Sequence, residues 1–378
     1  MKKAFSLLII IMLSVLSGCS GSIYAQYREL EQMRIIQIMG IDYDDSGVQL
    51  SLASSGGKNS QDAPAALSAS ASSISTALQR IRNFSCEEDL FCAHVGHILI
   101  GEEAARKGME NILSYICHSS EIRVDLPVYV MTNASARETM DSVGNSKKGI
   151  SEVLQSVQAA LSDRGESHIF TAAEIIRNIE RNGSALVCAL EHAAASEADT
   201  ESTAAVYGYG VIKDYSLVQL IDRENAVGAN FLMNKVGISD LMVRDLNGNA
   251  VTLEIDSGSS KLSPVWSADG HLTGLDIQAK VSAAVLEISG KGGDLDSPRY
   301  EDQLIAELEA AVSKRISSVL QLSKRLSADF MNLGSQVELC DPTKYRQTVS
   351  DFSYLLPTLE MRISVQGQLS HTYDVKDA

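Results

Sequence analysis

The chain has 378 residues, which is enough for two or three domains, and carries a formal net charge of −16. An acidic chain without clusters of Lys and Arg argues against nucleic acid as a partner, because basic side chains are what bind phosphates. The same charge argues against electrostatic attachment to anionic lipid. Hydrophobic residues make up 45% of the sequence, so a folded core is expected.

The first 18 residues have the layout of an export signal. Lys2 and Lys3 precede the apolar run at residues 4–16 (AFSLLIIIMLSVL), and small residues follow it. A membrane-spanning helix needs about 20 apolar residues, because the hydrocarbon core is about 30 Å thick. The run is shorter than that. We therefore expect residues 1–18 to be a cleaved signal peptide and the mature chain not to span the membrane.

Residues 16–19 (LSGC) resemble the bacterial lipobox, in which the cysteine receives a diacylglycerol and becomes the first residue of the mature chain. The alternative is an ordinary signal peptide with Cys19 as an incidental thiol. Acyl chains, including fatty acids such as palmitate, contribute about 0.8 kcal/mol for each buried CH₂ group, so two or three of them hold a protein durably at a bilayer. We expect acylated Cys19 to bind the chain to a lipid membrane.

The other cysteines form no regular pattern. They are five in number and scattered along the chain: Cys86, Cys92, Cys117, Cys188 and Cys340. An odd, irregularly spaced set predicts no disulfide framework. A single Cys86–Cys92 bridge and free buried cysteines both remain open.

The first half of the chain alternates strands and helices. A hairpin is expected first, because the β-branched stretch at 34–42 is followed by an acidic turn at 44–47 and by alternating apolar residues from Val48. Either Ser73 or Ser75 suits the N-cap of the next helix. The expected helices cover 76–84, 102–116, 135–143, 150–163 and 171–183, and the further strands cover 94–102 and 124–132. This order predicts a mixed sheet.

Residues 191–205 (EHAAASEADTESTAA) are polar and small, which favours a linker. The expected organisation is therefore a signal peptide at 1–18, an N-terminal α/β region at 19–190, possibly as two subdomains, a linker at 191–205, and a C-terminal α+β domain at 206–378.

The second half predicts a meander and one long helix. Asn-Gly and Asp-Gly pairs at 247–248 and 269–270 are typical of tight hairpins. The expected elements are strands at 206–222 around a turn, a helix at 223–236, strands at 241–246, 250–256 and 272–288, a helix at 298–330, and a last strand at 357–369. The fold class expected is α+β or mixed α/β and multidomain, with an N-terminal mixed sheet and a C-terminal antiparallel sheet packed by the long helix.

Two groups of residues are candidates for metal sites. Residues 42–47 (DYDDSG) match the first six positions of a calcium loop, but position twelve is Ala53 instead of a glutamate, so an acidic turn is favoured. The set Cys86, Cys92, His94 and His97 offers zinc ligands at a spacing that fits no common finger. In a strand over 92–100, Cys92 and His94 would share one face, and a structural histidine is favoured. We expect no metal and no cofactor.

The sequence contains no motif that names a catalytic residue. It has no nucleophile elbow, phosphate loop, dinucleotide fingerprint or metalloprotease helix motif. Gly208-Tyr209-Gly210 lacks the third glycine of a nucleotide site and is interpreted as small residues in a tightly packed strand. The chain is expected not to be an enzyme.

Four blocks taken in order resemble a known family. They are YRELEQMRIIQIMGID after the lipobox, HVGHILIGEEAARKGMENIL, VYGYGVIKDYSLVQLIDRENAVGANFL and DFSYLLPTLEMRISVQGQL. Together they resemble the Ger(x)C-type spore germination lipoproteins, the C subunits of nutrient germinant receptors. The resemblance covers nearly the whole mature chain, and Cys19 is the one functional residue that it transfers.

The resemblance implies a non-catalytic lipoprotein on the outer face of the spore inner membrane, working with the membrane-spanning A and B subunits of the germinant receptor. A substrate-binding lipoprotein of an importer is the alternative, which would need two doubly wound lobes around a ligand cleft. A surface-anchored hydrolase is a third hypothesis, which the sequence favours least.

Overall fold

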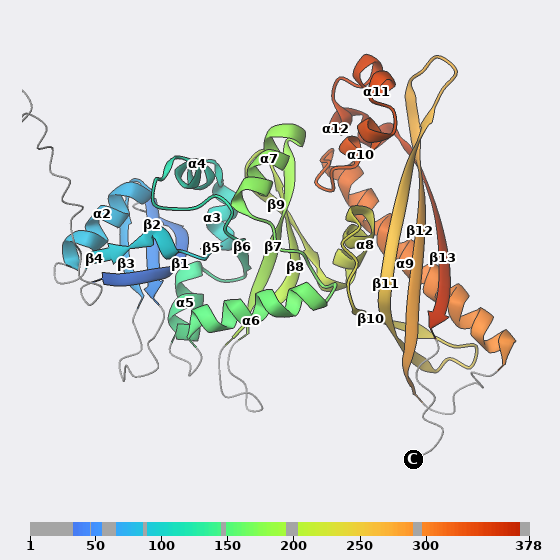
Figure 1. Cartoon of the computed structure of the whole chain (residues 1–378), viewed down its shortest axis with the longest axis horizontal. Helices are drawn as coiled ribbons and strands as arrows, with labels where there is room; N and C mark the ends of the chain where they lie inside the picture. The colour runs from blue at the N-terminus through green and yellow to red at the C-terminus, as the bar shows by residue number, and fades with distance from the viewer. Residues whose placement is uncertain are drawn as a thin grey trace, which may run out of the picture.

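The computed structural model describes residues 33–45, 47–54, 66–85, 89–144, 149–193, 203–289 and 297–370. Two β-sheets lie side by side along the long axis, each with its own helices (Figure 1). This arrangement confirms the expected mixed α+β class.

The first sheet contains nine strands. These are β1 (Met33–Asp44), β2 (Gly47–Ser54), β3 (Leu67–Ala71), β4 (Asp89–Phe91), β5 (His97–Ile100), β6 (Val128–Thr132), β7 (Ser184–Ala193), β8 (Thr203–Lys213) and β9 (Ser216–Asp222). Their order is β3-β2-β1-β5-β6-β7-β8-β9, with β4 paired to β1. The pairs β1–β5, β5–β6 and β6–β7 are parallel, whereas the flanking pairs β1–β2, β2–β3, β7–β8 and β8–β9 are antiparallel. The sheet is therefore mixed, as predicted.

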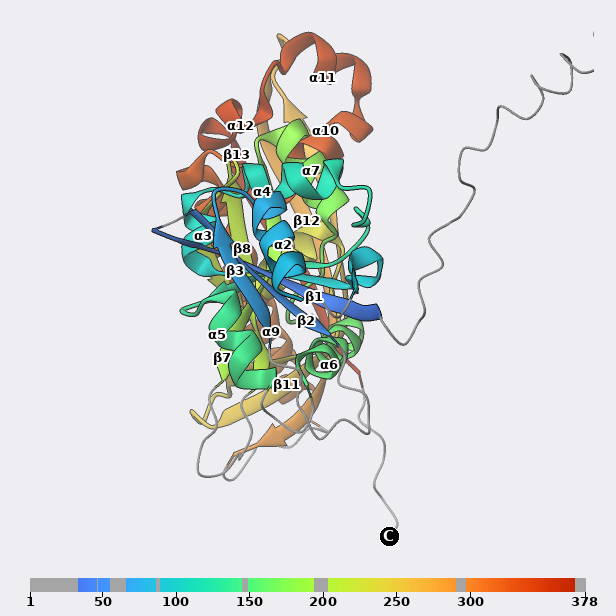
Figure 2. The ribbon, with the colours of Figure 1, turned by 90° about the vertical axis from the view of Figure 1, so that its left-hand side faces the viewer.

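Helices cover both faces of the parallel part of this sheet. They are α2 (Ile74–Phe84), α3 (Glu102–Lys107), α4 (Glu110–His118), α5 (Ala136–Gly144), α6 (Ile150–Asp163) and α7 (Ala172–Asn182). Figures 1 and 2 show α2, α4 and α7 above the sheet and α5 and α6 below it. The lower helices bury Met140 and Leu154 in a core separate from the one under α2, α4 and α7.

Local signals explain where several helices begin and end. Helix α2 begins after Ser73, whose Oγ accepts a hydrogen bond from the backbone N–H of Thr76 at 3.2 Å. Helix α7 has a capping box between Thr171 and Glu174 and ends at Gly183, whose φ of 66° is left-handed. Both ends of α7 lie where the sequence predicts them.

The helix expected at 102–116 is two helices. Gly108 has a φ of 138°, which breaks the helix between α3 and α4. The break lets the backbone N–H of Met109 donate to the carbonyl of Tyr215 at 2.7 Å, which joins α4 to the β8–β9 turn. A one-helix prediction missed this because the contact comes from a distant segment.

The second sheet has four strands, in the order β10-β11-β12-β13. They are β10 (Ser239–Arg244), β11 (Ala250–Trp266), β12 (Leu272–Ile288) and β13 (Glu360–Ser370), and the helices of this half are α8 (Arg223–Met233), α9 (Pro298–Leu326), α10 (Leu333–Cys340), α11 (Pro342–Thr348) and α12 (Phe352–Leu355). Strands β10 to β12 form the predicted meander, with turn glycines at φ 80° and 83°. Strand β13 pairs parallel to β12, because it returns after the long crossover through α9.

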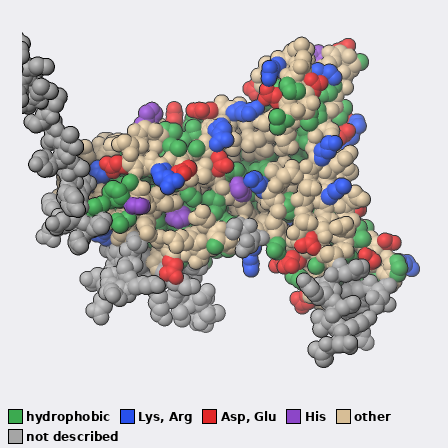
Figure 3. All heavy atoms as spheres, viewed as in Figure 1, with side chains coloured by type: hydrophobic (Ala, Val, Ile, Leu, Met, Phe, Trp, Pro, Cys, Tyr) green, Lys and Arg blue, Asp and Glu red, His purple; other side chains and the backbone are tan. Residues whose placement is uncertain are grey.

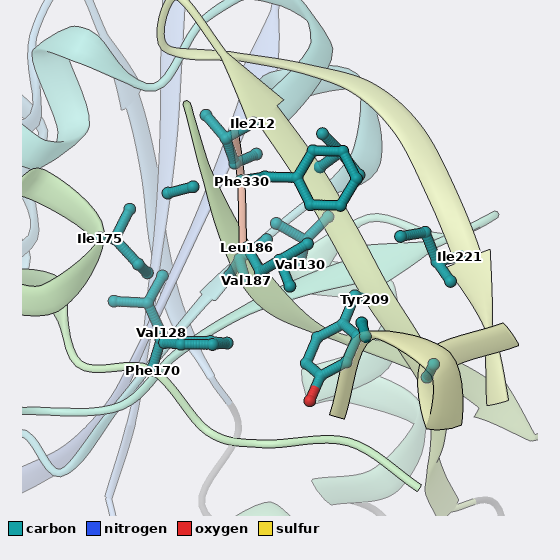
Figure 4. Close-up of a cluster of buried hydrophobic side chains, with 14 of the residues drawn as sticks. Val128, Val130, Phe170, Ile175, Leu186, Val187, Tyr209, Ile212, Ile221 and Phe330 are labelled. Atoms are coloured by element: carbon teal, nitrogen blue, oxygen red, sulfur yellow. The ribbon is translucent and has the colours of Figure 1, made fainter. Parts of the chain in front are cut away.

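Helix α9 packs on this sheet through the predicted apolar stripe. Leu304, Leu308, Val312 and Val319 are buried, and Leu322 and Leu326 are half-buried against the same core. The helix ends at Leu326, before the predicted end at Phe330, because Ser327 takes a left-handed φ of 47°. The chain then leads Phe330 into the first half of the molecule, where it lies beside Ile212 (Figure 4).

The expected linker at 191–205 includes the end of β7 and the start of β8. Strands β7 and β8 pair from Ser184 with Lys213 to Ala193 with Thr203, so β8 and β9 extend the first sheet. Residues 194–202 lie outside the described residues. A division of the chain at 191–205 therefore stays a prediction, and it does not coincide with a division between the two sheets.

Candidate functional site

The one functional residue predicted from the sequence, Cys19, lies outside the described residues, as do residues 1–18. Within the described ranges, no helix has the length and apolar character that crossing a bilayer would require. Lipidation at Cys19 stays a prediction.

A hollow of about 610 Å³ lies at the carboxyl ends of the parallel strands β1, β5 and β6. Open α/β sheets commonly bind ligands at this edge, because helix N-termini point toward it. Here the hollow is lined mainly by acidic and polar side chains, including Asp42, Glu102, Glu103 and Glu138.

One of the chain's own carboxylates occupies the start of α5. Asp42 is buried and accepts hydrogen bonds from the backbone N–H groups of Ala136 at 2.8 Å and Arg137 at 2.9 Å, which caps α5. Glu102 accepts from the backbone N–H of Asn133 at 2.6 Å and pairs with Arg106 at 2.7 Å. The two backbone donors at the start of α5 are thus already bonded within the chain.

Burial is the main influence on the Asp42 carboxyl. It raises the pKa of Asp42, and the two backbone hydrogen bonds oppose that rise. Asp44, the next acidic residue of the weighed calcium loop, instead accepts a hydrogen bond from Ser70 Oγ at 2.6 Å. The two carboxylates contact different parts of the protein, as suits the acidic turn that the sequence favours.

The candidate zinc ligands Cys92, His94 and His97 do not form one site. Cys86 lies outside the described residues, and Cys92 and His94 form a 3-10 turn, so the expected strand face over 92–100 is wrong there. His97 is buried on β5 with its ring 5.9 Å from that of Tyr129. Burial lowers the pKa of His97 to about 4 and raises the pKa of the Cys92 thiol. Across the described ranges, three or more potential metal-binding side chains nowhere converge.

Gly208 and Gly210 serve packing. A Cβ at Gly208 would lie 2.2 Å from the carbonyl oxygen of Ile221 on β9, and Gly208 has a φ of 138°. A Cβ at Gly210 would lie 2.9 Å from Leu217. This close approach of β8 to β9 agrees with the packed-strand interpretation.

A second cleft, of about 660 Å³, lies where α10–α12 meet the first half of the molecule. Figure 3 shows basic and acidic side chains gathered at this junction. Arg181 at the end of α7 pairs with Glu338 of α10 at 2.6 Å, and Lys213 Nζ donates to the carbonyl of Leu326 at 2.7 Å. The charged groups of the cleft are largely bonded across it, so they hold the two halves together.

Asp329 lies beneath this junction and is 1% exposed. Its carboxylate accepts hydrogen bonds from the backbone N–H groups of Leu333 at 2.7 Å and Gly334 at 2.8 Å, at the start of α10. Burial raises the pKa of Asp329 to about 6, against the lowering influence of these bonds and of Arg181. The sequence analysis missed this residue, although an acidic side chain shortly before a helical stretch is a capping signal.

Comparison with known families decides the identity of the chain. The model of the spore germination protein N-terminal domain matches residues 26–191. A second model, described as spore germination B3/GerAC like, C-terminal, matches residues 207–373. The chain belongs to the GerAC spore germination family. The resemblance stated from the four sequence blocks is therefore confirmed.

The GerAC-family assignment agrees with the fold. The crystal structure of the GerBC protein superposes with a TM-score of 0.58 at 15% identity, covering 88% of this chain and 96% of that one. At this identity the likeness shows a shared fold. A search among curated proteins finds no match. The two GerAC family matches leave residues 192–206 between them, which include the connection from β7 to β8.

Proposed function

We propose that the chain is the lipoprotein C subunit of a spore nutrient germinant receptor. A diacylglycerol on Cys19 anchors it to the outer face of the spore inner membrane, where it assembles with the membrane-spanning A and B subunits to trigger germination. The observation that carries the proposal is the pair of GerAC family models that match residues 26–191 and 207–373, beginning shortly after the lipobox.

The anchoring part rests on residues 16–19 (LSGC) and on the short apolar run before them. The first described strand begins at Met33, so the segment after Cys19 can reach at most about 50 Å even when fully extended. The folded body would thus be held near the lipid headgroups. Such tethering raises the effective concentration of weak partners, so modest interfaces with the A and B subunits suffice.

The proposal assigns the subunit no catalytic role. At the carboxyl edge of the parallel strands, Asp42 occupies the two backbone donors at the start of α5 that a substrate anion could use. The charged side chains of the second cleft pair across the junction, as Arg181 does with Glu338. Both hollows thus support an assembly function. An importer's binding protein would need a second doubly wound lobe, and the four-stranded second sheet does not favour that alternative.

Replacing the lipidated residue tests the proposal. Cys19→Ala should abolish incorporation of a labelled fatty acid into the protein and leave spores slow or silent toward particular nutrients. Cys117→Ala is the matched control, because Cys117 is an exposed free cysteine in the folded body. It should leave both labelling and germination unchanged.

Two results would contradict the proposal. If Cys19→Ala still incorporated the labelled fatty acid, Cys19 would not be the lipidated residue. If the variant protein were not labelled but its spores responded to nutrients as the wild type does, the lipid anchor would not be needed for germination. Assembly is tested separately by purifying the tagged wild-type chain from spore membranes. The A and B subunits should copurify with it, and their absence would contradict assembly while leaving the anchor intact.

A further inference from the structure

Strand β10 forms one edge of the second sheet. It pairs with β11 on one side, and no described strand pairs with its other side (Figure 1). At its start, the backbone N–H of Gly165 donates to the carbonyl of Ile238 at 2.7 Å, so that the edge is covered only up to residue 238. The free edge therefore consists of Ser239–Arg244, a typical strand length.

Exposed side chains alternate along this edge in a symmetric order. Three large apolar side chains stand four residues apart: Ile238 is 44% exposed, Met242 is 72% exposed and Leu246 is 68% exposed. Exposed Asp240 and Arg244 lie between them on the same face. Centred on Met242, the order is apolar, acidic, apolar, basic, apolar.

We propose that β10 pairs with β10 of a second copy of this chain, antiparallel and with Met242 opposite Met242. In this register Asp240 lies opposite Arg244 of the second copy, and the pairing ends before Ile238, whose carbonyl is already bonded to Gly165. The twofold axis repeats each contact. The result joins the two four-stranded sheets into one continuous sheet of eight strands.

The charges select this register. Moving the twofold axis to Asp240 or to Arg244 would place like charges directly opposite each other, which is destabilising. Moving it to residue 241 or 243 would place a charged side chain opposite Met242. A parallel, in-register pairing would align Asp240 with Asp240 and Arg244 with Arg244. Centring on Met242 is the arrangement that pairs opposite charges and places the exposed Met242 side chains opposite each other.

Alternate residues of β10 direct their backbone N–H and C=O groups toward the open edge of the sheet. The carbonyl of Ile238 points to the open edge, whereas the N–H of Asp245 bonds to the carbonyl of Asn249 on the β11 side at 3.0 Å. Because these directions alternate along a strand, Asp240, Met242 and Arg244 point their backbone groups to the open edge. The antiparallel pair would then form about six backbone hydrogen bonds.

Open space lies beside the last residues of this edge, Met242–Arg244. A hollow of about 430 Å³ runs between β10 and the turn of α9 that contains Ala310 and Ala311. Small side chains on α9 keep it open, and methionine adapts readily to a new apolar neighbour. Pairing over six residues buries less area than a standard interface, so we expect a dissociation constant of about micromolar order.

Charge exchange tests both the dimer and its register. The wild-type mature chain, in mild detergent at about 100 µM, should sediment as a dimer, since that concentration exceeds the expected dissociation constant. Asp240→Arg and Arg244→Asp each place like charges in two symmetry-related pairs, and each should weaken the dimer about 30-fold. The double variant Asp240→Arg/Arg244→Asp should restore wild-type affinity.

Mixing the two single variants separates pairing from folding defects. A chain with Asp240→Arg presents two basic groups and one with Arg244→Asp presents two acidic groups, so a 1:1 mixture should form heterodimers although each variant alone is largely monomeric. Arg244 donates to the carbonyl of Gly248 at 3.0 Å, so circular dichroism must show that Arg244→Asp keeps the fold. Asp269→Arg, the same charge change in the exposed β11–β12 turn, is the matched control and should leave the dimer intact.

Several outcomes would overturn the proposal. A wild-type chain that stays monomeric excludes the dimer, and so does a dimer that neither single variant weakens. A double variant as weak as the singles, or a mixture without heterodimers, excludes the register. Equal weakening by Asp269→Arg would show that overall charge, instead of β10 pairing, controls association.

Discussion

Asp329 should make the stability of the protein depend on pH. Its carboxyl group is buried beneath α10, and burial raises its pKa from 3.8 to about 6. Because the folded state holds this proton more tightly than the unfolded state, the contribution of Asp329 to stability is fully present below pH 3.8 and is lost as pH rises through about 6. At about 1.4 kcal/mol per pH unit, the loss amounts to about 3 kcal/mol.

The variant Asp329→Asn removes this ionisation and keeps the shape of the side chain. Its amide has one oxygen, so one of the two N–H groups of Leu333 and Gly334 loses its acceptor, which costs about 1–3 kcal/mol. At pH 4 the wild type should therefore be the more stable protein by about that amount. Between pH 4 and pH 7.5 the difference should move by about 3 kcal/mol in favour of the variant.

Urea unfolding of both proteins at several pH values measures this difference. Other ionisable groups affect both proteins alike, so they cancel when the two free energies of unfolding are subtracted. The nearby Arg181 is common to both chains and provides no separate source of pH dependence. A difference that stays constant from pH 4 to pH 7.5 would refute the argument from burial.

Two further substitutions test the packing of the first sheet. Gly208→Ala should lower the free energy of unfolding by about 3 kcal/mol or more, because the new Cβ would lie 2.2 Å from the carbonyl oxygen of Ile221. The control is Gly248→Ala, at a turn glycine with positive φ and open space around it, which should lower the free energy of unfolding by about 1 kcal/mol. Equal losses in the two variants would contradict the packing role of Gly208. Asp42→Ala should cost about 1–2 kcal/mol and speed hydrogen exchange of the Ala136 amide, because α5 loses its cap. Asp141→Ala, on the exposed side of α5, should change neither quantity, and a matching loss there would exclude the capping explanation.

The sequence predicts well those features that neighbouring residues determine. Helix α7 is an example, since Thr171 and Glu174 cap its start and Gly183 ends it in a left-handed conformation. The β10–β11 and β11–β12 turns follow from Gly248 and Gly270 for the same reason. Such signals act over a few residues, so they can be recognised without knowing the tertiary structure.

Features that depend on distant segments were missed. The composition of residues 191–205 predicts a linker, and it gives no sign that Glu191 pairs with Ala205 across β7 and β8; the division of the chain at 191–205 stays a prediction. The break at Gly108 depends on Tyr215, and the direction of β13 depends on the path after α9. Each of these outcomes is decided by contacts between residues far apart in the chain.

The same distinction applies to the candidate site. Asp42 was interpreted as part of an acidic turn, but its hydrogen-bond partners at the start of α5 lie 94 and 95 residues later. The burial of Asp329 likewise requires the packed junction of α10 with the first half of the molecule. Cys19 is predicted from the lipobox, which is a local pattern, and it stays a prediction because it lies outside the described residues.

The apolar cluster that contains Phe330 and Ile212 runs without interruption from the first sheet into the second. Because the described part of this core is continuous between the two sheets, we expect the sheets to move together as one rigid unit. A displacement of β13 in the second sheet would then also move the first sheet, including β1.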